Sequence, residues 1–143
     1  LKGKKPVSVK FVSGETIETS TWKKVVQAIL KHCNKQPDMH ERLMWLRGRV
    51  FGRQRIILGE FPEEMDVPIQ IDEGLYFEGK FDTEALITMM RKKVLEPVGY
   101  DSNEIVIQYI ARNPMILERQ SHMRMEDAED IPDEAQGSWM EIR

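Results

Sequence analysis

The sequence predicts an α+β fold in which a small, largely antiparallel sheet packs against two or three helices. Two observations lead to this prediction. Residues 22–33 carry apolar side chains at helical spacing, and several short segments rich in β-branched residues are separated by Gly, Pro and Asp turns. The 143 residues suit one α+β domain, which we expect over residues 1–113, followed by an acidic, mobile tail over residues 114–143.

The helix predicted over residues 22–33 organises the N-terminal half. Its apolar side chains recur at i, i+3, i+4, i+7, i+8 and i+11, from Trp22 to Cys33. The Thr-Ser-Thr run at 19–21 offers side-chain oxygens that can cap the first N–H groups. Upstream, two β-rich stretches flank a Ser-Gly-Glu turn at 13–15, and this pattern predicts a β-hairpin that leads into the helix.

The remaining elements are predicted from similar local patterns. A second helix is expected over residues 39–47, ended by Gly48, and a strand or hairpin over 48–61. Two short paired strands should flank the turn at 72–74. A helix should begin at Asp82 or Thr83 and stop at Pro97 and Gly99, and a strand over 104–110 should be the last ordered element. We expect the following residues in the core: Trp22, Val26, Ile29, Leu75, Phe77, Leu86, Ile105 and Ile107.

Charge is distributed unevenly along the chain. Residues 1–60 carry 13 Lys and Arg against 5 Asp and Glu, residues 61–113 carry 5 against 11, and residues 114–143 carry 3 against 8. The basic N-terminal half can attract a polyanion although the whole chain has a net charge of −3, because distant charges are screened.

The cellular setting is inferred from what the sequence lacks. One cysteine allows no internal disulfide, and neither a signal peptide nor a run of apolar residues long enough to span a bilayer is present, so we expect a cytoplasmic protein with no membrane contact. The first residue is Leu1 rather than methionine, and we expect a module of a longer protein, with a fused enzyme domain or a protein partner.

Four arginines interleaved with aromatic residues form the candidate nucleic-acid-binding segment. Guanidinium groups bind phosphates bidentately, and aromatic rings stack on unpaired bases. The alternative is that these arginines pair with the acidic half of the same domain. The candidate DNA-binding residues are Arg47, Arg49, Arg53, Arg55 and Trp45, extended by Lys23 and Lys24 if the first helix lies beside them.

No catalytic or metal site is predicted. Asp72, Glu78 and Lys80 resemble the aspartate and Glu-x-Lys of metal-dependent nucleases, but a turn residue and a strand residue six positions on should lie nearly 20 Å apart at about 3.3 Å per residue. Asp66 could replace Asp72 only if its loop folds back. Cys33 continues the apolar face of its helix and should be inert, and the histidines show no zinc-binding spacing.

Several segments, taken in order, resemble a small accessory domain at the C-termini of bacterial restriction–modification, phage-defence and mobile-element proteins. The segments are Lys5-Pro6-Val7-Ser8-Val9-Lys10-Phe11, residues 19–22 before a helix, Val67-Pro68-Ile69-Gln70-Ile71, Gly74-Leu75-Tyr76-Phe77-Glu78, and Pro97-Val98-Gly99-Tyr100-Asp101 before Glu104-Ile105-Val106-Ile107. The resemblance covers residues 5–110. Lys80-Phe81-Asp82-Thr83 stands where that family has an Asn-Leu-Ser helix start.

The resemblance implies a non-catalytic accessory module, without a cofactor, of a larger DNA-acting defence or restriction-type protein. Together with the arginine segment, it leads us to expect contact with DNA. The alternative is a protein–protein or regulatory interaction module that binds no nucleic acid.

Overall fold

The structure is a computed structural model that describes residues 3–52, 55–111 and 120–124, and it confirms the α+β class. The elements of this part of the chain are β1 (Lys4–Lys10), β2 (Thr16–Glu18), α1 (Trp22–Asn34), α2 (Pro37–Leu46), β3 (Val50–Phe51), β4 (Ile56–Gly59), a 3-10 turn η1 (Pro62–Glu64), β5 (Pro68–Asp72), β6 (Leu75–Glu78), α3 (Thr83–Met89), a π-helical segment η2 (Met90–Leu95), α4 (Glu96–Val98), β7 (Val106–Ala111) and β8 (Gln120–Arg124). Within it, no helix is both long enough and apolar enough to cross a membrane.

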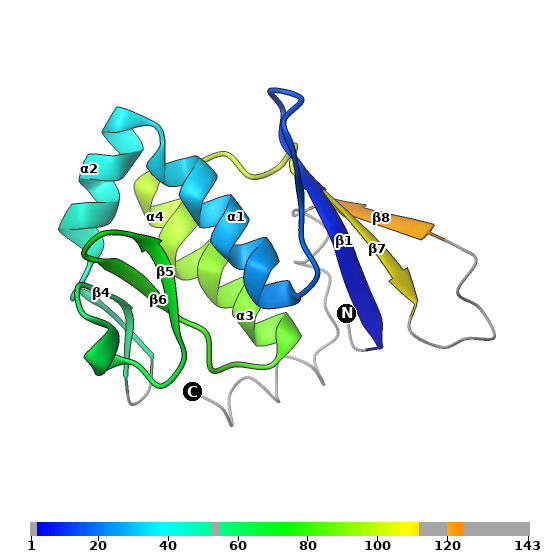
Figure 1. The fold of residues 1–143 in the computed structure, drawn as a ribbon. Coiled ribbons are helices and arrows are strands. Elements are labelled where there is room, and N and C mark those ends of the chain that lie inside the picture. Colours follow the sequence, from blue (N-terminus) through cyan, green and yellow to red (C-terminus); the bar gives the residue numbers. More distant parts are fainter. Residues whose placement is uncertain (1–2, 53–54, 112–119, 125–143) are drawn as a thin grey trace.

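The described strands form two sheets rather than the single sheet that we predicted. Sheet A has the order β2-β1-β7-β8, sheet B has the order β3-β4-β6-β5, and all pairings are antiparallel. Helices α1, α3 and α4 lie between the two sheets (Figure 1). The prediction of one sheet is wrong because α1 packs against β1 on one side and β5 on the other, which separates the strands into two groups.

Helix α1 is the central element, as its apolar pattern predicts. Thr21 caps it, since its side chain accepts the Lys24 N–H. Trp22 at its start donates its indole N–H to the Lys4 carbonyl of β1 at 3.0 Å. Gln27 donates to the Gln70 carbonyl of β5 at 2.8 Å, which covers an edge of sheet B. The helix is therefore joined by hydrogen bonds to both sheets.

The predicted core is confirmed. All eight predicted residues are buried, and Trp22 is the most accessible of them at 6%. They belong to one continuous apolar cluster that joins the helices to both sheets. Burial of this cluster is the main stabilising contribution to the fold.

The helical run that begins at Thr83 continues past Pro97, so the prediction that this proline stops the helix is wrong. Asp82 caps the run, because its side chain accepts the Ala85 N–H at 2.9 Å. The turns before Pro97 widen into η2, where the Glu96 N–H donates to the Arg91 carbonyl five residues back. A proline lacks an N–H and crowds the carbonyl four residues earlier, and a π-helical turn accommodates both. The run ends at Gly99, whose φ is 81°.

The prediction that the strand ending at residue 110 is the last ordered element is also wrong. Strand β8 lies within the predicted tail and pairs antiparallel with β7, from Val106 opposite Arg124 to Ile110 opposite Gln120. A polar segment can form such a ladder, because the pairing groups are backbone N–H and C=O. The rest of the predicted tail, together with residues 112 and 113, lies outside the described residues, and the prediction that the tail is mobile therefore stays a prediction.

Candidate functional site

The arginine segment runs from the end of α2 through the β3–β4 hairpin. Gly48 follows α2 with a φ of 77°, in the left-handed region that glycine adopts without steric penalty, and its N–H donates to the Leu58 carbonyl at 2.7 Å. The hairpin closes where the Gly52 N–H donates to the Arg55 carbonyl at 2.8 Å. These bonds hold the backbone on either side of Arg53, which lies outside the described residues.

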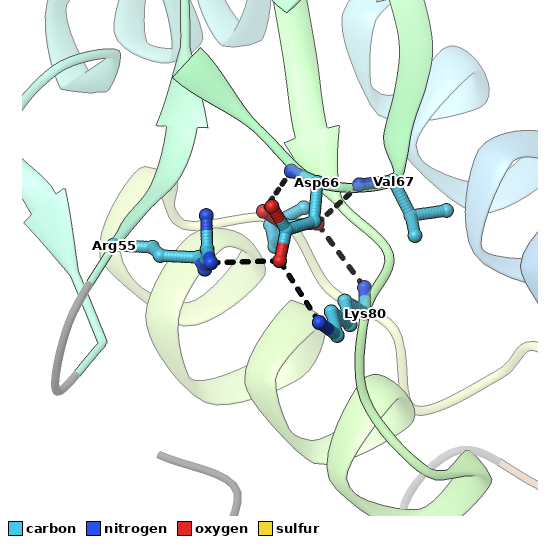
Figure 2. Close-up of polar contacts among 5 residues, drawn as sticks. Arg55, Asp66, Val67 and Lys80 are labelled. Carbon is cyan, nitrogen blue, oxygen red and sulfur yellow. Dashed lines mark hydrogen bonds and ion pairs between the residues drawn. The ribbon is translucent and has the colours of Figure 1, made fainter.

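Two of the predicted DNA-binding arginines are held by the domain itself. Arg47 is half-buried, and its Nη1 donates to the Gly74 carbonyl at 2.7 Å. Arg55 Nη2 lies 2.7 Å from Asp66 Oδ2, and Lys80 Nζ lies 3.1 Å from the same oxygen. Figure 2 shows Asp66 between these two cations. Arg55 therefore pairs with the acidic part of the same domain, as the alternative interpretation expects.

Trp45 and Arg49 form an exposed pair at the end of α2. The Trp45 residue is 65% accessible to solvent. The Arg49 guanidinium carbon lies 4.4 Å from the centroid of the indole ring, and Arg49 Nε donates to the Trp45 carbonyl at 2.8 Å. The four-residue spacing at the end of the helix brings the two side chains together. The exposed indole therefore lies beside a positive charge that the stacking holds in place.

An open cavity of about 300 Å³ lies beside this pair. The lining residues that matter here are Trp45, Arg47, Arg49, Glu60, Phe61 and Glu64. Phe61 is 53% accessible, and its N–H donates to Glu64 Oε1 at 3.0 Å, which fixes the loop before β5. Glu60 has no hydrogen-bond or ion-pair partner among the described residues. The sequence analysis did not identify Glu60 and Phe61 as site residues. The one sequence feature that could have indicated them is the aromatic side chain of Phe61 in a polar, proline-bounded loop.

Lys23 and Lys24 do not join this cavity. Both are exposed in the first turn of α1, and Lys24 Nζ donates to Ser20 Oγ at 3.3 Å. The arginine segment follows α2, which begins just beyond the opposite end of α1 (Figure 1). Helix α1 has 13 residues and is therefore about 20 Å long at roughly 1.5 Å per residue. The structure thus places these lysines at the end of α1 that is remote from the start of α2, and neither lysine lines the cavity.

The Glu78 carboxylate is a buried anchor for the loops at one end of the β5–β6 hairpin. It is 1% accessible and accepts the N–H groups of Asp66 at 3.0 Å, Val67 at 2.9 Å and Lys80 at 3.2 Å. The loop that carries Asp66 does fold back towards Glu78. Asp72 lies at the other end of the β5–β6 ladder, as its predicted distance from Glu78 requires.

Both carboxylates of this arrangement have partners within the domain. A carboxylate offers about four lone-pair positions, and backbone N–H groups occupy three of those on Glu78. The Asp66 carboxylate, in turn, is engaged by Arg55 and Lys80. In the described ranges, no group of three or more His, Cys, Asp and Glu side chains is placed to hold a metal ion.

The predicted inert cysteine, Cys33, is next in sequence to His32, a half-buried histidine with polar and aromatic partners. His32 Nδ1 and the Tyr100 hydroxyl are hydrogen-bonded at 2.7 Å, and the imidazole stacks on Phe11 with the ring centroids 3.9 Å apart. Burial lowers the pKa of His32, and the nearby Glu15 carboxylate partly opposes this shift. Burial raises the pKa of the fully buried Cys33 thiol to about 12, so the reactive thiolate is scarce.

Comparison with known proteins identifies no relative: no protein-family model, curated protein or solved structure matches the chain. The candidate site is therefore defined by its geometry alone.

Proposed function

We propose that this domain is a non-catalytic module that binds unpaired nucleic-acid bases on the aromatic surface, which consists of Trp45, Arg49 and Phe61. The observation that supports the proposal best is Trp45, a residue that is 65% accessible and whose indole has a guanidinium carbon 4.4 Å from its ring centroid. Every base has a π-face that can stack on an exposed aromatic ring, and the neighbouring arginine supplies a positive charge for a phosphate.

Unpaired bases fit the aromatic surface better than a duplex does. A duplex keeps its base faces stacked, and its binding depends on many contacts between cations and phosphates. Arg47 and Arg55 already have partners within the domain, and the lysines of α1 lie at the far end of that helix. We therefore expect one or two phosphate contacts, which correspond to a shallow slope of about −0.7 to −1.4 in log affinity against log salt.

We further propose that the module serves a larger DNA-acting defence or restriction-type protein, as the resemblance over residues 5–110 implies. The use of both Glu78 oxygens by backbone N–H groups supports a non-catalytic role. The single buried cysteine suits the reducing conditions of the cytoplasm, which is where we place the protein.

A protein partner at the same surface is the second candidate function. The positive charges of Arg47 and Arg49 around the cavity are balanced by the negative charges of Glu60 and Glu64. The lining therefore has no net charge that would attract a polyanion. Exposed Trp and Arg side chains are also the residue types that dominate binding energy in protein interfaces. If a protein partner occupies this surface, the domain should bind that partner tightly and have no affinity for DNA.

Fluorescence anisotropy with a labelled oligothymidylate and a matched duplex, measured across a salt series, separates the two candidates. The test variants are Trp45→Ala and Arg49→Ala. The matched controls are Phe51→Ala, an aromatic residue that is 57% exposed but does not line the cavity, and Lys93→Ala, an exposed cation on η2.

We expect the single strand to bind more tightly than the duplex, and Trp45→Ala to weaken this binding by at least about fivefold, since base–aromatic stacking contributes about 1–3 kcal/mol. The control variants should bind like the wild type. If neither nucleic acid binds at low salt, or if Trp45→Ala and Phe51→Ala behave alike, the nucleic-acid proposal is wrong and the protein-partner candidate replaces it.

A further inference from the structure

We propose that the cavity beside Trp45 is a base-selective pocket, in which Glu60 selects guanine from the other bases of a single strand. This inference rests on the proposed function and adds to it the chemical identity of the preferred base. It starts from an unusual combination around one cavity: two exposed aromatic residues, a stacked arginine, and a carboxylate that has no partner among the described residues.

The aromatic residues leave room for one planar ring system. Arg49 lies over the Trp45 ring, and the Trp45 residue is nevertheless 65% accessible, so a base can stack on the part of the ring that Arg49 leaves exposed. Phe61 is 53% accessible on the same cavity. At about 300 Å³, the cavity is at the small end of the range for ligand pockets, which suits a single base better than a folded segment.

The two glutamates of the cavity have different roles. Glu64 Oε1 accepts the Phe61 N–H at 3.0 Å and so holds the loop. The stem of Glu60 lies beside the β5–β6 turn, with Cγ 4.0 Å from the position that a Cβ on Gly74 would take. Arg47 donates to the carbonyl of the same Gly74. The stem of Glu60 thus lies beside this turn, and its exposed carboxylate keeps its acceptor positions for a ligand.

A carboxylate accepts hydrogen bonds and donates none, and this restricts the base that it can pair with. On the Watson–Crick edge, guanine presents the N1–H and N2–H₂ donors side by side, which match the two carboxylate oxygens. Adenine and cytosine place one donor beside an acceptor, and thymine places its N3–H between two acceptors. These three bases bring an acceptor against the Glu60 oxygens, which is repulsive. Guanine alone satisfies both oxygens without a conflict.

The same carboxylate should weaken the general attraction of a phosphate backbone, because its negative charge lines the same cavity as Arg49. Selectivity for guanine thus comes at the expense of non-specific affinity. A Glu60→Gln substitution should lower the affinity for a guanine-containing oligonucleotide, raise the affinity for the others slightly, and so remove most of the difference between them. The ratio of two affinities, rather than either affinity alone, is therefore the readout.

The experiment measures binding of three oligothymidylates that carry one central guanine, inosine or adenine. Quenching of tryptophan fluorescence that is lost in Trp45→Ala reports stacking on Trp45. Inosine lacks the N2 amine of guanine and keeps N1–H, so it tests the second hydrogen bond. Glu60→Gln is the test variant. Glu63→Gln is the control, because Glu63 is an exposed carboxylate of the same loop that does not line the cavity.

We expect the guanine oligonucleotide to bind about tenfold more tightly than the adenine one, with inosine between them, because a bidentate contact to a base discriminates by roughly this factor. The difference should fall to within about twofold in Glu60→Gln and persist in Glu63→Gln. Equal binding of the three oligonucleotides, with loss of binding in Trp45→Ala, would overturn guanine selection and leave the proposed function intact. Absence of all binding at low salt would overturn both.

Discussion

Replacing the buried Glu78 carboxylate by an amide, in Glu78→Gln, should lower the free energy of unfolding by about 2–3 kcal/mol. The substitution conserves size and shape, so it changes hydrogen bonding without creating a cavity. Glu78 is 1% accessible and accepts three backbone N–H groups, two of them on the loop that leads into β5. Its side chain therefore holds that loop against the end of β6.

The magnitude follows from the three bonds taken separately. An amide has one oxygen, which can occupy the position of Oε2 and still accept from Val67 and Lys80. Its NH₂ group then faces the Asp66 N–H, which loses its acceptor. An unsatisfied and partly buried donor costs about 1–2 kcal/mol, and loss of charge assistance in the other two bonds costs about 1 kcal/mol.

Urea denaturation followed by far-ultraviolet circular dichroism measures this difference. The control is Glu41→Gln, which neutralises an exposed carboxylate on α2 and should change the free energy of unfolding by less than about 0.5 kcal/mol. The expected loss corresponds to a thermal midpoint lowered by about 5–10 °C. If Glu78→Gln is as stable as Glu41→Gln, then Glu78 is not an anchor, and the reason for excluding it as a metal ligand is lost.

Three further predictions concern ionisable groups. Because the pKa of His32 is lower in the folded state, its contribution to stability is present above pH about 6.5 and is lost as the pH falls towards the folded pKa. The thermal midpoint should therefore fall more between about pH 7.5 and 5.5 in the wild type than in His32→Gln. Equal falls in the two proteins would contradict this prediction. With its pKa raised to about 12, native Cys33 should react with a thiol reagent at about pH 8 roughly a thousandfold more slowly than in urea, and similar rates would show that the thiol is accessible. DNA incubated with the domain and Mg²⁺ should stay intact, and cleavage that is lost in Asp66→Ala would show a nuclease.

The elements that the sequence predicts correctly are those specified by local chemistry. The apolar spacing from Trp22 to Cys33 gives α1, and the oxygens of Thr21 and Asp82 cap the helices that follow them. Each pattern lies within one or two turns of chain and needs no partner to be recognised. The Trp45–Arg49 pair belongs to the same class, because four residues at a helix end are neighbours in space.

The features that the sequence does not reveal depend on pairing between distant segments. The division into two sheets follows from which strands meet α1, and β8 is held by backbone bonds that its composition does not specify. At the site, Arg55 and Asp66 are both charged and both near turns, but nothing local shows that they form an ion pair. Glu60 and Phe61 likewise become site residues only because β4 brings their loop back beside the end of α2.

The pairing of β1 with β7 has a consequence for the order in which the protein folds. Lys4 lies opposite Ala111, so the centre of sheet A joins the two ends of the described domain, whereas sheet B is built from strands of one intervening stretch. Contacts between such distant segments form slowly, because a long loop must close first. During synthesis, α1 can pack on β1 and on sheet B as these strands are made, but one edge of β1 has no partner until β7 is made. A ribosome that pauses before residue 111 is made would therefore hold a nascent chain in which this edge of β1 is exposed to chaperones.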